Sequence, residues 1–517
     1  MRRLLAVSLI LMASGPTFAE SAEREFELLP FPDGDYSDRI TIGIPFPPGD
    51  LSSVADFQLF VDGKSVEIAA RPILRWHWLD NSIRALRVQF DLSVGTDKKF
   101  HFLTGSAAGP PMNTLAEDTQ AGMSFLAVMS PHWLTRSRVA GPQVPWSRHE
   151  PYDRFVDTGY QWARDLPLDG KGAAWLFDRT TTILRHYVRT GDPMVLRHGV
   201  RAARFYVSHI KKDGAPGRPD CRGGWQYAGI SPCDPKYVYL EPLLIYSALT
   251  GDDSFLEAAL IEKMVSAWGT IPGPYRTTSK MFTERFAGLG LLAITAAWEI
   301  TGNKKYLDAV GSRIGWLHSH QNGNPDAQPP DGSWRHSWQK HEFERYDPVT
   351  DTRGASPWMS ENIISGLWSA WWATQDPRIP QMIASFGEYL ENHGWIRDDV
   401  FVVSGNTWKS DCGGKDAPIS WYWSSSVEPL NKLIAIQNDH GWNSDAHSPE
   451  LAFVSAAAAY FTDDAELRYR LLSRIALLEQ TTFNPRCARN SRPPRRFNWS
   501  NRSTPGYRWI INELRDP

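Results

Sequence analysis

The spacing of apolar residues changes along the chain. Between residues 24 and 110, apolar and polar residues alternate in runs such as 39–44, 57–61 and 83–90, which predicts short β-strands. From about residue 171, apolar residues recur three and four positions apart, as at 183–188 and 306–317, which predicts amphipathic helices. We therefore expect a mainly α-helical protein with an N-terminal β-domain over residues 24–110 and a linker of mixed character over 111–170.

A short turn sequence recurs in the helical part, and its copies begin at Thr190, Thr250, Thr301, Thr374 and Thr462. In most copies a Gly follows the Thr and can adopt the left-handed conformation that ends a helix. The Asp or Asn that follows can cap the next helix. The copies are too far apart and too unevenly spaced for a regular solenoid. They predict an (α/α) toroid of five or six helix pairs over residues 171–485, preceded by a small β-barrel or sandwich.

The N-terminus has the features of a secretory signal over residues 1–19. Arg2 and Arg3 precede an apolar run at 4–12, and small residues follow near 17–19. The run is too short to span a bilayer, so we expect a periplasmic or secreted protein without an integral membrane segment. A net charge of −3 gives no reason to expect a nucleic-acid partner. Oligomeric state is not predicted.

The four cysteines can pair in an oxidising compartment. Cys221 and Cys233 lie in one loop and are the favoured pair, and Cys412 with Cys487 could form a second. No Cys-x-x-Cys motif is present, so no metal ligands and no cofactor are expected. A structural or charge-neutralising divalent cation is left open.

Acidic residues recur at the starts of the helices that enter the tight turns: Glu241, Glu284, Glu361, Glu428 and Glu450. Such acids can simply favour the helix dipole, by about 0.3–1 kcal/mol each. In a toroid, however, these helix starts converge on one cavity at the edge that carries the long loops, where function usually lies. We therefore expect at least one or two of these carboxylates to line that cavity.

Neighbouring residues could complete a site there. The sequence has 23 Trp, eleven of them between residues 334 and 442, and flat aromatic faces suit sugar rings, although Trp also fills helical cores. The candidate catalytic residues are Glu284, Arg285, Glu361, Asn362, His336, His341, Tyr239 and Glu241. The candidate substrate-binding residues are Trp334, Trp338, Tyr237, Trp421, Tyr422 and Glu428.

Two N-terminal motifs resemble a known family. The run 43–49 (GIPFPPG) and the run 73–84 (ILRWHWLDNSIR) are similar to the first β-domain of the exo-rhamnogalacturonan lyase-like proteins. In the second motif Trp78, Asp80 and Ser82 match the family pattern, whereas Leu79 and Asn81 depart from it. The resemblance implies a β-barrel before an (α/α) toroid and a polysaccharide substrate, although the chain lacks room for that family's C-terminal β-domain.

Two mechanisms fit these residues. A lyase acting on a uronic acid must neutralise the sugar carboxylate and then transfer protons, and the suitable residue types are present in Arg285, Asn362, His336, His341, Tyr239 and Lys236. A glycoside hydrolase needs two carboxylates, for which Glu241, Glu284, Glu361 and Glu428 are candidates. The resemblance favours the lyase. A non-catalytic glycan-binding protein is a further alternative.

The C-terminal residues 486–517 contain seven Arg and no acid between 486 and 508. We expect a basic, solvated tail that wraps the helical domain. Such a tail could also help to hold an anionic chain.

Overall fold

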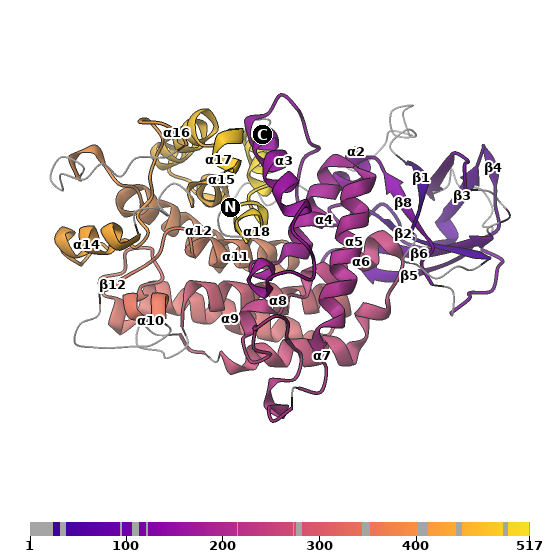
Figure 1. Ribbon diagram of the computed structural model, residues 1–517, viewed down its shortest axis with the longest axis horizontal. Coiled ribbons are helices and arrows are strands. Elements are labelled where there is room, and N and C mark those ends of the chain that lie inside the picture. The colour runs from indigo at the N-terminus through magenta and orange to yellow at the C-terminus, as the bar shows by residue number, and fades with distance from the viewer. Residues whose placement is uncertain are drawn as a thin grey trace.

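The computed structural model describes residues 24–31, 38–91, 93, 96–105, 113–119, 122–214, 216–271, 273–275, 282–343, 352–400, 412–440, 447–489 and 495–515. The predicted signal peptide lies outside these residues. Figure 1 shows the N-terminal strands at one end of the molecule and α10, β12 and α14 at the opposite end, with the other helices between them.

The N-terminal domain is built from two antiparallel sheets. One has the strand order β4-β3-β7-β1-β8 and the other β2-β6-β5. Phe46, which follows β2, packs its ring against Phe57 and Phe102 of the larger sheet, so the sheets enclose a common aromatic core. The strands are β1 (Glu25–Pro30), β2 (Arg39–Pro45), β3 (Phe57–Val61), β4 (Lys64–Ser65), β5 (Ala69–Arg75), β6 (Ile83–Asp91), β7 (Phe100–Thr104) and β8 (Phe125–Met129).

The three strands predicted from alternating residues are confirmed as β2, β3 and β6. The predicted end of the domain at residue 110 is wrong, because β8 pairs with β1 along its whole length from Phe125 to Met129. The predicted linker over 111–170 therefore contains a strand of the β-domain and, after it, two helices.

The rest of the chain is mainly helical, as predicted. Within its described residues, four two-residue strands interrupt it: β9 (Ile210–Lys211), β10 (Gly224–Trp225), β11 (His336–Ser337) and β12 (Arg353–Gly354). The helices are α2 (Pro131–Arg136), α3 (Pro151–Arg164), α4 (Arg179–Thr190), α5 (Pro193–Ser208), α6 (Glu241–Thr250), α7 (Ala258–Ala267), α8 (Glu284–Thr301), α9 (Lys304–Gly323), α10 (Trp338–Phe343), α11 (Ser360–Thr374), α12 (Arg378–Tyr389), α14 (Leu430–His440), α15 (Ser448–Phe461), α16 (Ala465–Thr481), α17 (Pro485–Arg489), α18 (Arg496–Asn501) and α19 (Gly506–Arg515).

All five predicted turns join consecutive helices, namely α4/α5, α6/α7, α8/α9, α11/α12 and α15/α16. In every copy the Asp or Asn side chain accepts a hydrogen bond of 2.7–3.1 Å from the backbone N–H two residues later. The Thr hydroxyl of every copy accepts a second bond, of 3.1–3.3 Å, from the N–H of that Asp or Asn. This second bond explains why Thr recurs at the start of every turn.

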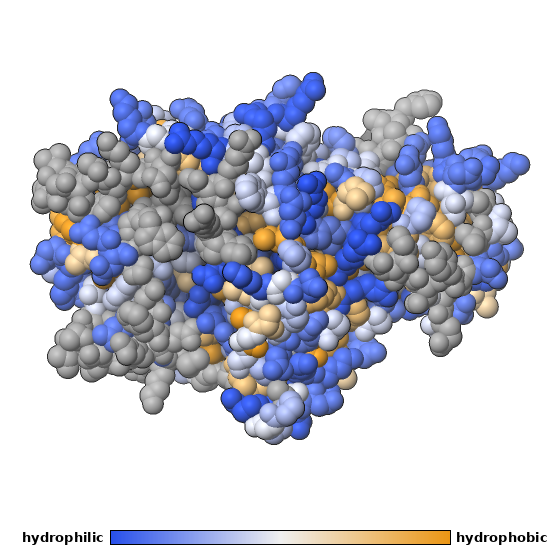
Figure 2. All heavy atoms as spheres, viewed as in Figure 1, coloured by the Kyte–Doolittle hydropathy of each residue, from blue (hydrophilic) through white to orange (hydrophobic). Residues whose placement is uncertain are grey.

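The first helix of each pair is the more enclosed one. Helices α6, α8, α11 and α15 are buried along almost their whole length, whereas α5, which follows α4, buries one face only. Helix α4 contacts α6, α6 contacts α8, α8 contacts α11, α11 contacts α15, α15 contacts α18, and α18 contacts α4. Among the coloured residues of the face drawn in Figure 2, hydrophilic ones predominate, and apolar residues form patches between them.

The C-terminal segment is not a solvated tail, which corrects the prediction for residues 486–517. Helix α18 packs against α3, α4 and α15, and α19 packs against α15. Arg496 and Arg502 are buried, and Arg502 lies 3.4 Å from a carboxylate oxygen of Glu361. Arg502 and Arg508 therefore pair with Glu361 and Glu150, and Phe497 and Trp499 are core residues.

The β-domain covers the turns of the first three helix pairs. A Cβ atom on Gly43 of β2 would lie 2.4 Å from the carbonyl oxygen of Ala248, and one on Gly302 would lie 2.7 Å from the His77 ring. Arg84 of β6 forms an ion pair of 2.7 Å with Glu299 near the end of α8. The edge of the helical domain that carries the tight turns is thus the face on which the β-domain docks. Gly43, His77 and Arg84, from the two N-terminal motifs at 43–49 and 73–84, contribute to this contact.

Both predicted disulfides are confirmed. Cys221 bonds Cys233 and Cys412 bonds Cys487, with Cα–Cα distances of 4.8 and 4.9 Å. Paired cysteines fit an oxidising location such as the periplasm or the extracellular space. Among the described residues, no helix combines the length and the apolar character needed to cross a bilayer.

Candidate functional site

Three predicted site residues meet at the loop-rich end of the helical domain. Glu284 is the first residue of α8, where the Thr283 hydroxyl caps the helix by accepting from the N–H of Phe286. The pairing of β11 with β12 positions His336, and the short helix α10 carries His341. The Glu284 Oε2 atom lies 2.9 Å from His336 Nε2 and 3.6 Å from His341 Nδ1. We call these three residues the Glu–His cluster.

The Glu–His cluster is buried, so its histidines are not exposed loop residues. Glu284 and His336 are 0% exposed and His341 is 4% exposed. Burial opposes ionisation of Glu284, and the pKa of this carboxyl falls below its usual value when positive charge faces it from the side of His336 and His341. Burial lowers the pKa of His341, and the nearby Glu284 partly offsets that shift. The donor atoms of the three side chains all lie within 4.8 Å of one another, a spacing at which they could hold a metal ion.

Aromatic and cationic side chains surround the Glu–His cluster. The Tyr422 ring lies 5.7 Å from that of His341 and 5.9 Å from that of Trp338. Arg285 follows Glu284 in α8, and its charge acts on both His341 and Tyr237. Arg495 precedes α18, and its charge interacts with the ionisable groups of Tyr237, Arg285 and Tyr422. We call Arg285, Arg495, Tyr237, Tyr422 and Trp338 the loop-edge group.

The other predicted catalytic residues lie elsewhere. Glu241 pairs with Arg185, and Glu361 pairs with Arg502 and accepts from the Ser503 hydroxyl. The Tyr239 hydroxyl accepts from the backbone of Phe177 and donates to the backbone of Lys236, so it has a structural role. The Asn362 amide donates to the carbonyl of Met359 in its own helix, where α11 packs closely against α8.

Three predicted substrate-binding residues are structural. Trp334 is fully buried, stacks on Phe386 and donates its indole N–H to the backbone of Leu317. Trp421 belongs to a separate apolar cluster with residues such as Ile396 and Leu433. Glu428 accepts from the backbone N–H of Arg353 and pairs with Lys432. A Trp or Glu in a loop-rich segment therefore did not distinguish site from scaffold.

Sequence analysis missed a buried acid beside Glu241. Asp178 caps α4 by accepting from the N–H of Thr181, with a backbone φ of 58°. Burial and then the charge of Glu241 raise the pKa of Asp178 to about 7. Asp178 and Glu241 line one small cavity together with Tyr239 and Arg502. The capping pattern was visible in the sequence, but no residue pattern showed that this cap is enclosed.

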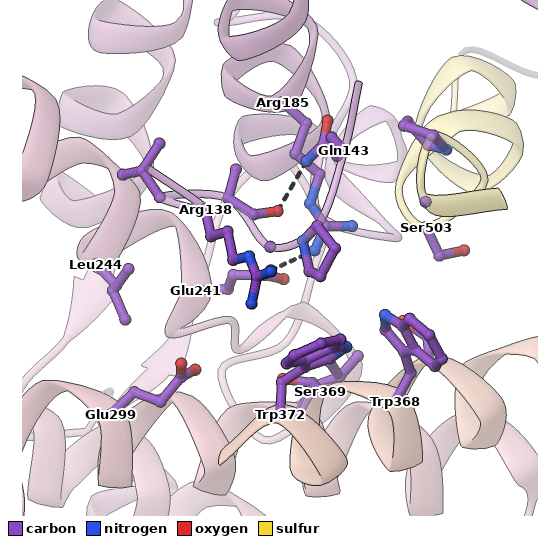
Figure 3. A pocket seen from close by; sticks show the side chains of 18 of the residues that line it. Arg138, Gln143, Arg185, Glu241, Leu244, Glu299, Trp368, Ser369, Trp372 and Ser503 are labelled. Atoms are coloured by element: carbon purple, nitrogen blue, oxygen red, sulfur yellow. Dashed lines mark hydrogen bonds and ion pairs between the residues drawn. The ribbon is translucent and has the colours of Figure 1, made fainter. Parts of the chain in front are cut away.

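A larger cavity lies among α4, α6, α8 and α11 under the β-domain (Figure 3). We call it the central pocket, and its volume is about 80 Å³. Trp368 and Trp372 of α11 present their rings to it, and the guanidinium of Arg138 lies 4.9 Å from the Trp372 ring centre. Among the described residues, no carboxylate lies within ion-pair distance of Arg138. Glu241 and Arg185 also line the pocket, whereas none of the loop-edge group does.

No known family model matches the chain, and a search of curated proteins finds no match.

Proposed function

We propose that the chain is an exported polysaccharide lyase, which cleaves a glycan containing uronic acid by β-elimination. The proposed scaffold is an (α/α) toroid, in which α4, α6, α8, α11 and α15 form the inner ring and the C-terminal helices close it. The unbroken succession of contacts from α4 through α15 and α18 back to α4 supports this arrangement. The similarity of residues 43–49 and 73–84 to the exo-rhamnogalacturonan lyase-like proteins supports the substrate class.

One observation carries the proposal. The charges of Arg285 and Arg495 both act on Tyr237, and Arg495 also interacts with Tyr422, so these four residues of the loop-edge group lie near one another. The proton on C5 of a uronate is too weakly acidic to be removed until the neighbouring carboxylate is neutralised. Arg285 and Arg495 supply positive charge for that carboxylate, because guanidinium groups bind carboxylates in a planar, two-pronged geometry.

The remaining step is proton transfer. In β-elimination a base removes the C5 proton, a double bond forms between C4 and C5, the bond from C4 to the glycosidic oxygen breaks, and that oxygen takes up a proton. We assign this proton transfer to the phenol of Tyr422, whose ring lies 5.7 Å from that of His341 and 5.9 Å from that of Trp338. Glu284 and His336 are 0% exposed and His341 is 4% exposed, whereas Tyr422 is 9% exposed, so the polymer contact is assigned to Tyr422 rather than to the Glu–His cluster.

The products test this proposal. The purified protein should be incubated with a panel of polysaccharides, some rich in uronic acid and some neutral. A lyase releases an unsaturated sugar that absorbs ultraviolet light, and only the acidic members of the panel should yield it. New reducing ends without that absorbance would show hydrolysis instead. No product from any member would overturn both enzymatic proposals.

A hydrolase is the second candidate, because the carboxyl groups of Asp178 and Glu241 line one cavity. The raised pKa of Asp178 suits a general acid. Glu241 forms an ion pair with Arg185. Two carboxyl groups in one site are typical of glycosidases. The hydrolase would act at the cavity lined by Asp178 and Glu241 rather than at the loop-rich edge.

A further inference from the structure

We infer that Glu284, His336 and His341 bind a divalent transition-metal ion. This inference goes beyond the proposed function and does not depend on it, because the ion could support the fold whether or not the chain cleaves a glycan. The inference rests on the directions of the donor atoms, on the tautomer of His336 and on the chemistry of the donor set.

The donor atoms of the Glu–His cluster face one another without bonding. Glu284 Oε2 and His336 Nε2 are 2.9 Å apart, but they are not aligned for a hydrogen bond. Neither atom has another hydrogen-bond partner in the described part of the chain, and neither ring nitrogen of His341 has one there. Buried polar atoms are almost always satisfied in native proteins. Four such atoms in one fully buried cluster indicate that a further species belongs among them.

The tautomer of His336 indicates the charge of that species. Its Nδ1 atom lies 3.3 Å from the carbonyl oxygen of Trp334, which can only accept, so Nδ1 carries a hydrogen. In a neutral imidazole, Nε2 then presents a lone pair to the carboxylate of Glu284. Two lone pairs at this separation repel unless a positive charge lies between them. A proton could supply that charge, but the poor alignment of the two atoms favours a cation set to one side of the line that joins them.

The donor set selects the class of cation. Two imidazole nitrogens and one carboxylate oxygen suit zinc and neighbouring transition metals, whereas calcium and magnesium prefer oxygen donors. Ligand atoms about 2.1 Å from a tetrahedral ion lie about 3.4 Å apart. The observed separations of 2.9 and 3.6 Å fall on either side of that value.

Neighbouring backbone groups already orient two of the ligands. The N–H of Ser356 donates to Oε1 of Glu284 at 2.8 Å, which leaves Oε2 for the ion. The Trp334 carbonyl fixes the His336 ring in the same way. Outer contacts of this kind are typical of metal centres, where they set the ligand tautomer and direction.

The test measures metal content directly. The purified full-length protein should be stripped with a chelator, reloaded with Zn²⁺ or Co²⁺, dialysed and analysed by elemental mass spectrometry. We expect one equivalent of either ion to be retained, and visible absorption bands from coordinated Co²⁺. Ca²⁺ should not be retained. His341→Gln should lose the bound ion.

His320→Gln is the matched control. His320 is also buried in this region, but its Nε2 atom lies 2.8 Å from the Arg335 carbonyl, so we expect the variant to retain the ion. Failure of the wild-type protein to retain Zn²⁺ or Co²⁺ would overturn the inference and leave a proton between Glu284 and His336. Equal retention by His341→Gln would overturn it as well. If that variant does not fold, the Co²⁺ spectrum of the wild-type protein decides, because an absence of absorption bands contradicts the site.

Discussion

The ion pair between Arg84 and Glu299 is the clearest test of how the β-domain docks on the helices. It joins β6 to the end of α8 with a distance of 2.7 Å, and its side chains are only 5% and 17% exposed. The Arg84 guanidinium also lies 4.2 Å from the centre of the Trp76 ring. The substitution Glu299→Gln would keep the shape of the side chain and leave Arg84 enclosed without its counter-charge.

The expected cost follows from this geometry. At 2.7 Å and an effective dielectric constant of about 20, the attraction between the two charges is about 6 kcal/mol, before desolvation is subtracted. Removing one partner of a buried pair typically costs about 3–5 kcal/mol, because the remaining charge is left buried. Glu299 retains some contact with solvent, so we expect a loss of about 3 kcal/mol in the free energy of unfolding.

A double-mutant cycle in a urea titration measures this cost. Glu299→Gln, Arg84→Gln and the double variant should give a coupling energy of about 2 kcal/mol or more. Asp399→Asn, which breaks an exposed pair with Arg397 whose side chains are 64% and 70% exposed, should cost less than about 1 kcal/mol. A coupling below about 0.5 kcal/mol would refute the claim that this pair holds the two domains together.

Two further predictions concern pH and packing. The Asp178 carboxyl ionises near pH 4 in the unfolded chain but has its pKa raised to about 7 in the fold, so the folded protein keeps a proton that the unfolded chain loses. As the pH rises from about 4 to about 7, Asp178 therefore lowers the free energy of unfolding by up to about 4 kcal/mol. Urea titrations at a series of pH values should show a smaller decrease for Asp178→Asn than for the wild-type protein. An unchanged pH profile would contradict the assignment. Gly43→Ala should destabilise the protein by about 1–3 kcal/mol in thermal unfolding, because the new Cβ would meet the Ala248 carbonyl. Gly311 lies in α9, where an added Cβ would have no atom within 4 Å, so Gly311→Ala should stabilise the protein by about 0.5–1 kcal/mol. Equal effects of the two substitutions on thermal unfolding would contradict the close contact between Gly43 and the Ala248 carbonyl.

The helix pairs could be predicted because their signals are local. A Thr followed two residues later by Asp or Asn fixes both sides of each turn through bonds within five residues, so the sequence shows it directly. The end of the β-domain could not be predicted, since β8 joins the sheet through pairing with β1, almost a hundred residues earlier. The C-terminal arginines were misread for a related reason, because their acidic partners are distant in sequence, as Glu361 is from Arg502.

The candidate site was predictable in part. Glu284, His336 and His341 were chosen for their chemical types, and the fold brings them together. Glu361 was chosen for its place at a helix start, which Glu284 shares, yet it neutralises an arginine inside the protein. Local sequence does not distinguish an acid that faces a cavity from one that balances a distant cation. Arg138 of the central pocket gave no signal, because only its surroundings in the fold mark it.

The central claim is that the chemistry takes place at the loop-rich edge, and one comparison tests it directly. Release of unsaturated product from a uronic-acid-containing polysaccharide should be measured for the wild-type protein, Tyr422→Phe and Asp178→Asn. Each substitution changes a single polar group, and folding can be checked by circular dichroism. The account predicts that Tyr422→Phe loses about 100-fold or more in rate, while Asp178→Asn stays close to the wild-type protein. Full activity in Tyr422→Phe with loss in Asp178→Asn would contradict the account and place the chemistry at the cavity lined by Asp178 and Glu241.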